Sequence, residues 1–125
     1  NDLARAVLEG VCFALADGMD VLHASGLQPS GITLIGGGAR SPFWRQMLAD
    51  ISGQRLEYRT GGDVGPALGA ARLAQIALNP QRSLAELLPE LPLEQVHTPD
   101  AERHQQYAER RSTVRELYTR LLPLM

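Results

Sequence analysis

A short apolar run at residues 32–35 leads into Gly-Gly-Gly-Ala-Arg-Ser at residues 36–41, and an apolar helical pattern follows. This order predicts a strand, a glycine-rich turn and a helix that begins at Ser41. A turn without β-carbons lets a ligand approach the backbone, and the helix that follows offers unpaired N–H groups and a partial positive charge. The arrangement suits a phosphorylated ligand, most often a nucleotide. It is a binding element and carries no chemistry of its own.

Length and composition limit the classes of protein that this chain can belong to. Its 125 residues allow one domain with a modest core. The 44% hydrophobic and 21% charged content and the net charge of -2 are ordinary for a soluble protein, and the absence of a basic stripe argues against nucleic acid as a partner. No apolar run approaches the roughly 20 residues of a membrane span. The single Cys12 excludes an internal disulfide framework, so we expect a reducing, cytoplasmic location.

Hydrophobic periodicity predicts five helices and two short strands. Helix 3–24 is apolar nearly all round, which is typical of a helix buried between layers. Ser41 caps the second helix, which Gly53 ends, and Trp44 is expected to pack in the core. The other predicted elements are strands 32–35 and 55–58, a helix that Pro66 opens and that ends before Asn79, a short capped helix 83–88, a proline-bearing connector 89–99, and a last helix 100–122 with Tyr107, Val114, Leu117, Leu121 and Leu122 facing inward.

The alternation of helices and strands predicts a layered α/β domain with parallel strand neighbours. Two short strands cannot form a stable sheet alone, so further strands are expected upstream of residue 1. The chain has no initiator Met, the lead-in Asn1-Asp2 is barely long enough to cap a helix, and residues 121–125 resemble the close of a terminal helix. We therefore expect a C-terminal piece of a longer protein; the alternative is a small protein with a processed N-terminus.

Two common phosphate-binding motifs do not fit the glycine turn, as we call residues 36–41. A P-loop requires a lysine, and the chain contains none. The dinucleotide pattern requires a third glycine where Ser41 stands, so an oxidoreductase of that type is a distant alternative. A tight strand-to-helix turn would need only one glycine. The three consecutive glycines therefore favour a bound ligand.

Residues 36–46, Gly-Gly-Gly-Ala-Arg-Ser-Pro-Phe-Trp-Arg-Gln, resemble the adenosine-binding motif of the FGGY carbohydrate kinases, which belong to the actin-like ATPase superfamily. Residues 5–15 resemble the helix before that motif, residues 67–71 the small-residue helix after it, and residues 107–122 the closing helix of the family. The resemblance therefore covers nearly the whole chain. It implies an α/β fold that is part of the actin-like, ribonuclease H-like C-terminal lobe, truncated at its N-terminal strands. Residues 1–125 would form this segment, with 100–125 as its closing helix.

The resemblance also implies the ligands. ATP with Mg²⁺ would lie in a cleft between two lobes, with the sugar and the catalytic aspartate held by the absent N-terminal lobe. Gly37 and Gly38 would let adenosine lie against the main chain, and Ala39 would continue that wall. Ser41 would cap the helix beside the ligand, while Arg40 would either lie along the adenine or reach solvent. No catalytic residue and no protein ligand of a metal are expected in this chain.

The implied reaction is the phosphorylation of D-xylulose to D-xylulose 5-phosphate. The alternatives are a kinase for another sugar or polyol (ribulose, gluconate or glycerol) and a non-catalytic α/β nucleotide-binding module. Pro42 and Phe43 stand where glycerol kinases carry asparagines, so an adenine contact made there is absent or different in this chain. Asp63 is interpreted as a helix cap or turn residue. A homo-oligomer is expected, and half of a cleft should be inactive alone.

Two groups of polar residues are predicted to have structural roles and not metal-binding or catalytic ones. His23, His97 and His104 share no metal-ligand spacing, so surface or capping roles are predicted. Asp17 and Asp20, three residues apart on the first helix, are interpreted as part of a solvated face. A glycine in the middle of a helix lowers the stability of that helix. We therefore expect Gly69 to allow the close approach of a neighbouring element.

Overall fold

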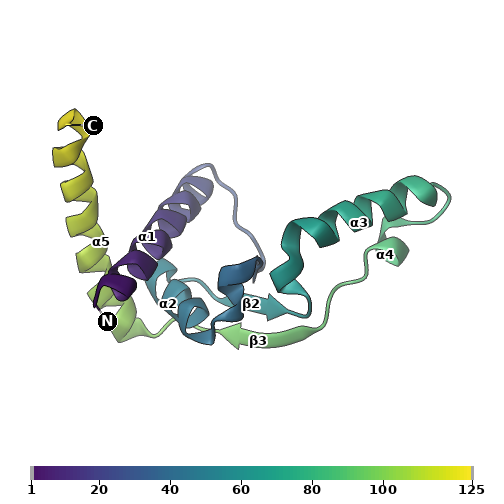
Figure 1. Cartoon of the computed structure of the whole chain (residues 1–125), viewed down its shortest axis with the longest axis horizontal. Coiled ribbons are helices and arrows are strands. Elements are labelled where there is room, and N and C mark those ends of the chain that lie inside the picture. The colour runs from purple at the N-terminus through teal and green to yellow at the C-terminus, as the bar shows by residue number, and fades with distance from the viewer. Residues whose placement is uncertain (1, 125) are drawn as a thin grey trace.

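The structure is a computed structural model that describes residues 2–124. Asn1 and Met125, which bound the predicted segment 1–125, lie outside the described residues. Figure 1 shows an elongated arrangement with α1 and α5 at one end, a small sheet in the middle, and α3 with α4 at the other end. The elements in chain order are α1 (Asp2–Ala24), β1 (Ile32–Leu34), η1 (Gly37–Arg40), α2 (Pro42–Ser52), β2 (Leu56–Arg59), η2 (Gly62–Val64), α3 (Gly65–Leu78), α4 (Leu84–Leu87), β3 (Leu93–His97), α5 (Ala101–Leu121) and η3 (Leu122–Leu124).

The sheet of the described residues has the order β1-β2-β3. β1 and β2 are parallel, as predicted, with Ile32 opposite Leu56. β3 is antiparallel to β2, with Leu56 opposite His97. The prediction of a connector over residues 89–99 was therefore wrong, because this segment contains a strand. The third strand of the described residues comes from downstream of β2.

The ends of several helices follow the predicted local signals. The Ser41 hydroxyl accepts a hydrogen bond from Trp44 N at the start of α2, and Gly53 ends that helix with a φ of 68°, in the left-handed region. Ser83 and Glu86 form the predicted capping box of α4. Asp100 caps α5 by accepting from Arg103 N. These short-range hydrogen bonds fix where the helices begin and end.

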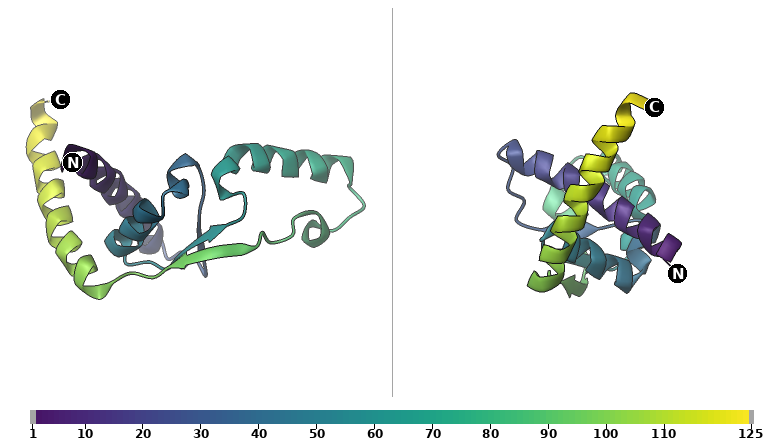
Figure 2. Two further views of the ribbon diagram at one scale, coloured as in Figure 1. Left: turned by 60° about the horizontal axis from the view of Figure 1, so that its bottom comes forward. Right: turned by 90° about the vertical axis from the view of Figure 1, so that its left-hand side faces the viewer.

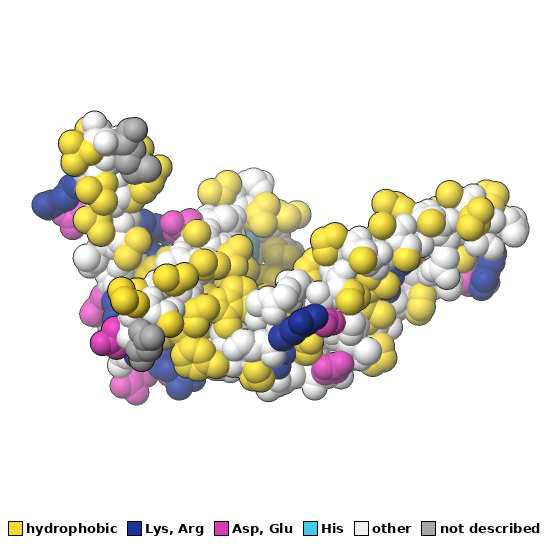
Figure 3. Space-filling model, viewed as in Figure 1, with side chains coloured by type: hydrophobic (Ala, Val, Ile, Leu, Met, Phe, Trp, Pro, Cys, Tyr) yellow, Lys and Arg dark blue, Asp and Glu magenta, His cyan; other side chains and the backbone are white. Residues whose placement is uncertain are grey.

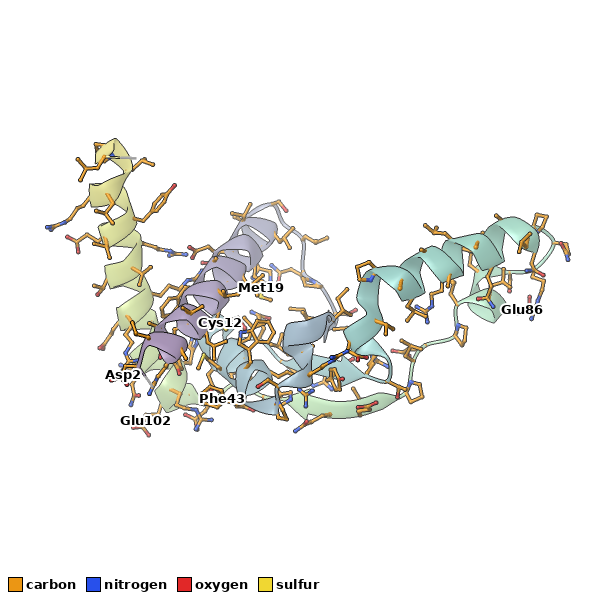
Figure 4. The ribbon with its side chains drawn as sticks, viewed as in Figure 1. Asp2, Cys12, Met19, Phe43, Glu86 and Glu102 are labelled. Carbon is orange, nitrogen blue, oxygen red and sulfur yellow. The ribbon has the colours of Figure 1, made fainter. Side chains whose placement is uncertain are left out.

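The hydrophobic core lies where α1, α2 and the sheet meet, and Tyr107 of α5 closes it. Phe13 and Tyr107 pack edge to face, with 6.4 Å between ring centroids. Cys12 lies on the stretch of α1 that packs against α2 (Figure 4). Burial raises the pKa of the Cys12 thiol to about 12, so the thiol is protonated and unreactive at neutral pH. Leu48, Ile51 and Leu56 are the largest of the other fully buried side chains.

The predicted burial of α1 and α5 was wrong for the described residues. Only Cys12, Phe13 and Ala16 are buried on α1, and only Tyr107 on α5. Val114, Leu117, Leu121 and Leu122 are exposed, because only the first part of α5 packs against α2 (Figures 1 and 2). Figure 3 shows apolar side chains along the visible faces of α1 and α3.

The small-residue helix α3 projects away from α1 and α2 (Figures 1 and 2). It has no buried residue, and a Cβ added at Gly69 would meet no described atom within 4 Å. The close approach expected at Gly69 is therefore not made by the described residues. No helix within residues 2–124 is both long enough and apolar enough to cross a membrane.

An ion cluster joins α1 to α5. The Nη2 atoms of Arg111 and Arg115 lie 2.7 Å and 2.8 Å from Asp20 Oδ2, and both arginines also donate to Asp17 Oδ1. Asp17 and Asp20 lie on the predicted solvated face, with 43% and 54% of their side chains exposed, and there they meet basic partners more than 90 residues away along the chain, which the sequence pattern did not indicate. The cluster joins the two helices by ion pairs.

We expect acid to weaken this contact between α1 and α5. Partial burial acts to raise the pKa of Asp17, but hydrogen bonds from Arg115 and Arg111 outweigh it and lower that pKa below its ordinary 3.8. A carboxylate whose folded pKa is depressed contributes stability above its unfolded pKa, and this contribution disappears as the pH falls through the folded value. Urea unfolding at neutral pH and at about pH 3 measures the loss.

The Asp17→Asn variant is the matched control for this prediction. It removes the titrating group, so the difference in unfolding free energy between the two pH values should be smaller than in the wild type. An equal difference in the variant and the wild type would show that Asp17 has no part in the acid sensitivity.

Candidate functional site

Two glycine-rich turns meet at one edge of the sheet. The glycine turn follows β1, and a second glycine turn, residues 61–65, follows β2. Because the two strands are parallel, their carboxyl ends lie side by side, which is where open α/β sheets bind ligands. Gly36 N–H donates to Gly62 O at 2.7 Å, and Arg40 Nη2 lies 2.9 Å from Asp63 Oδ2. These contacts hold the two turns together.

The backbone requires glycine where the two turns touch. Gly36 has a φ of +92°, a conformation that L residues rarely adopt. A Cβ on Gly62 would lie 3.0 Å from the carbonyl oxygen of Leu34, so a side chain there would push β1 away from the second turn. Glycine at these positions allows the close contact between the turns.

The two glycines predicted to face the ligand are exposed. A Cβ on Gly37 would meet nothing within 4 Å, and one on Gly38 would lie 3.6 Å from the Trp44 indole. Trp44 is half-buried and packs against the core, as predicted. The indole therefore packs beside the turn, next to main chain that carries no side chain at Gly37 and Gly38.

A hollow of about 360 Å³ lies against this main chain, and we call it the α1 hollow. Four of the five predicted cofactor-binding residues line it, namely Gly37, Gly38, Arg40 and Ser41, together with Leu8, Val11 and Trp44. Aliphatic side chains of α1 and an indole form its walls, opposite a backbone without side chains. Such walls suit a flat, largely apolar ring with polar groups at its edge.

Ala39 lies behind the glycine turn, away from the α1 hollow. Its side chain is fully buried in the core, and its N–H donates to Gly36 O at 3.0 Å. Arg40 reaches solvent, with 69% of its side chain exposed, and pairs with Asp63. Asp63 is a turn residue in η2, and its carboxylate binds Arg40 rather than capping a helix. Ser41 uses its hydroxyl as the cap of α2 and its N–H on Gly38 O.

A second hollow of about 470 Å³, the α3 hollow, adjoins the second glycine turn. This hollow was not predicted from the sequence, and Gly61, Gly62 and Gly65 form part of its lining. Arg59 and Arg72 line it, but Arg59 pairs with Glu57 and Glu90, and Arg72 donates to Pro89 O. The α1 hollow is the candidate for the predicted ligand because four of the five predicted cofactor-binding residues line it, whereas none of them lines the α3 hollow.

A buried polar network behind the glycine turn was also missed by sequence reasoning. Arg45 is 4% exposed and donates to Ala39 O at 2.6 Å, to His97 Nε2 at 3.0 Å and to Gln95 Oε1 at 2.6 Å. The surface or capping role predicted for His97 was wrong, because only 3% of this residue is exposed. His104, by contrast, lies beside the end of α2, with its Nδ1 2.8 Å from Asp50 O.

The protonation state of His97 follows from its partners. Burial, and then the positive charge of Arg45, lower the pKa of His97 below its ordinary 6.5, although Asp50 opposes the shift. His97 is therefore neutral at pH 7, with Nε2 accepting from Arg45 and Nδ1–H donating to Gln46 Oε1 at 3.1 Å. The ring serves as a fixed hydrogen-bond acceptor in the core.

Residues 2–124 contain no group of three or more His, Cys, Asp or Glu side chains that could hold a metal ion. The α1 hollow contains no acid and no nucleophile activated by a base. The arrangement can therefore bind and orient a ligand, but by itself it offers no general base and no electrophilic assistance.

Comparison with known proteins assigns the chain to a class of protein. The sequence matches the C-terminal domain of the FGGY family of carbohydrate kinases over residues 1–78, and the chain belongs to this family. The fold prediction is confirmed, since the structural neighbours are sugar kinases of the actin-like ATPase type.

Individual relatives resemble the chain along nearly its whole length. A xylulose kinase of Escherichia coli is 74% identical over 125 residues, which are 100% of this chain and 26% of that protein. A xylulose kinase of Klebsiella pneumoniae is 60% identical over 99% of this chain and 26% of its own length. The crystal structure of a xyloylose kinase from Brucella ovis covers 98% of this chain and 25% of that one, with 31% identity and a TM-score of 0.82. The chain thus spans about a quarter of the length of these relatives.

Proposed function

We propose that this chain is the adenosine-binding part of the second lobe of an ATP-dependent sugar kinase. The observation that carries the proposal is the α1 hollow, where bare backbone from Gly37 and Gly38 faces aliphatic side chains of α1. The adenine ring would lie between these walls, and the ribose and phosphates would extend past the carboxyl edge of β1 and β2. Residues 1–125 would form this part of the lobe, with 100–125 as its closing helix.

The contribution of the chain to phosphoryl transfer would be positioning. Catalysis of this reaction depends chiefly on orienting the nucleotide and on neutralising charge around the transferred group. The glycine turn would orient ATP by its adenosine end. The sugar, the base that accepts its hydroxyl proton and the groups around the γ-phosphate would come from the rest of the protein. Mg²⁺ would accompany the nucleotide phosphates, because the described residues provide no cation site.

We propose D-xylulose as the sugar, with D-xylulose 5-phosphate as the product. The support is sequence identity of 74% and 60% to two xylulose kinases, since the α1 hollow bears on the nucleotide and not on the sugar. The test is ADP formation by the full-length protein with D-xylulose, ribulose, gluconate and glycerol. A preference for gluconate or glycerol would reject D-xylulose. Absence of ATP binding by the full-length protein would instead leave a non-catalytic α/β module.

The isolated 125-residue chain should show no kinase activity. It would supply one wall of the cleft and none of the groups that contact the reacting atoms. The measurement is ATP-dependent phosphorylation of D-xylulose by the chain alone, with the full-length protein as the positive control. Turnover by the isolated chain would contradict the division of roles proposed here.

The partners of the chain would be ATP, the sugar and the N-terminal lobe of the same protein. Since ATP is the phosphoryl donor, the cytoplasm is the expected location.

A homo-oligomer is also proposed, and sedimentation of the full-length protein would test it. Apolar side chains such as Leu3, Val7 and Leu73, each more than 60% exposed, would lead the isolated chain to self-associate.

A further inference from the structure

We propose that Arg45 is a positioning residue for the nucleotide: it ties the Ala39 carbonyl, and with it the glycine turn, to strand β3. The inference rests on the proposed function, because the backbone held in this way is the predicted adenosine contact. Arg45 itself does not line the α1 hollow. It would act through the backbone on the far side of the turn.

The contact to the turn is short and shielded from water. Arg45 Nη1 donates to Ala39 O at 2.6 Å, Ala39 is fully buried, and Arg45 is 4% exposed. The first hydrogen bond of α2 runs from Arg45 N to Ser41 O, so the helix backbone does not occupy the Ala39 carbonyl. A buried carbonyl without a donor is costly, and a charged donor is stronger than a neutral one. The guanidinium therefore fixes the middle of the glycine turn.

The other side of the guanidinium is fixed by β3 and β2. Nε donates to His97 Nε2 at 3.0 Å and Nη2 to Gln95 Oε1 at 2.6 Å, and both acceptors belong to β3. The Arg45 guanidinium carbon also lies 4.0 Å from the centroid of the Tyr58 ring on β2. Three acceptors and an aromatic face leave the planar group a single orientation. The position of the turn is thereby coupled to a strand about 50 residues further along the chain.

Substitution of Arg45 should affect the nucleotide more than the sugar. In the full-length protein, Arg45→Gln should raise KM for ATP about tenfold, because small displacements of positioning groups cost one to two orders of magnitude. KM for D-xylulose should stay within about twofold, since the displaced backbone is on the adenosine side. ATP titration by calorimetry and steady-state kinetics measure the two effects.

Asp50→Asn provides a matched control on the same helix. Asp50 is 2% exposed and, like Arg45, belongs to a buried network, but its carboxylate binds Asp100 N at 2.9 Å and Arg103 Nε at 2.7 Å. These contacts lead to α5. Asp50 Oδ1 also accepts from Gln46 Nε2 at 2.9 Å, and the amide oxygen of asparagine keeps that acceptor, so the change removes the ion pair to Arg103 and leaves the side of the helix that faces His97 and the glycine turn. The control variant should lower the melting temperature while KM for ATP stays within about twofold.

The outcomes separate this inference from the proposed function. If the wild-type protein binds no ATP, the proposed function fails. If it binds ATP and Arg45→Gln binds it equally well, only the role of Arg45 is overturned. Equal rises in both KM values, or a rise in KM for ATP in Asp50→Asn as well, would show a general structural role and also overturn the inference.

Should Arg45→Gln fail to fold, Arg45→Lys decides the question. Lysine keeps one charged donor for the Ala39 carbonyl but loses the planar fork that reaches β3. The expected result is a rise in KM for ATP of about threefold to tenfold with little change in KM for D-xylulose. A KM for ATP within about twofold of the wild-type value would overturn the inference.

Discussion

Replacement of Gly37 by Leu should weaken ATP binding by about two orders of magnitude without unfolding the protein. A Cβ at Gly37 meets nothing within 4 Å, and Gly37 does not have a positive φ, so the backbone accepts a side chain without strain. The same side chain would project into the α1 hollow of about 360 Å³. If adenosine lies against this backbone, leucine occupies its place. We expect KM for ATP to rise about 100-fold, equivalent to about 2.7 kcal/mol of lost binding free energy.

The measurement is an ATP titration of the full-length protein together with its thermal unfolding curve. Gly31→Leu is the matched control, because Gly31 also has open space around it, lacks a positive φ and does not line the hollow. Both variants should melt within a few degrees of the wild type. A Gly37→Leu protein that loses stability but binds ATP normally would mean that protein side chains, and not a nucleotide, fill the space beside the turn.

Local signals allowed the glycine turn and the helix ends to be predicted. Ser41 caps α2 and Gly53 ends it with a positive φ, and each of these features depends on residues within one helical turn. The parallel pairing of β1 and β2 followed from the helix between them. The residues themselves indicated only a phosphorylated ligand. The resemblance to the family added that this ligand carries adenosine.

β3 could not be predicted because its stability comes from β2. Its sequence, Leu-Glu-Gln-Val-His over Leu93–His97, has weak apolar alternation, and Pro92 before it suggested a connector. The strand exists because the free edge of β2 offers it pairing partners 34 to 41 residues away, from Arg59–Leu93 to Leu56–His97. Pairing at such separations leaves no signal in a local window.

The network behind the turn was missed for the same reason. Arg45 and His97 are polar residues whose ordinary place is the surface, and each is buried because partners distant in the sequence, including the other, satisfy its hydrogen bonds. The error on α5 was of another kind. Its apolar positions were recognised, but periodicity identifies a face and not what covers it, and the described residues bury only Tyr107.

Gly62→Ala should destabilise the protein and weaken ATP binding together. A Cβ at this position would lie 3.0 Å from Leu34 O and 3.4 Å from the Tyr58 ring. The Leu34 oxygen is part of the backbone of β1 and cannot rotate away, so the second glycine turn has to move. The movement would break the hydrogen bond of 2.7 Å from Gly36 N to Gly62 O that joins the two turns. Overpacking of this kind costs about 1–3 kcal/mol.

Urea unfolding and ATP titration of the same samples test this effect. Gly31→Ala serves as the control, since its added methyl group meets no described atom within 4 Å and its unfolding free energy should change by about 0.5 kcal/mol or less. The comparison with Gly37→Leu is decisive. In Gly37→Leu, ATP affinity should fall while the free energy of unfolding stays unchanged. In Gly62→Ala, both should fall, because Gly62 supports the glycine turn to which Gly37 belongs. Wild-type stability with lowered ATP affinity in Gly62→Ala would show that this residue touches the nucleotide directly, and would place adenosine nearer the α3 hollow.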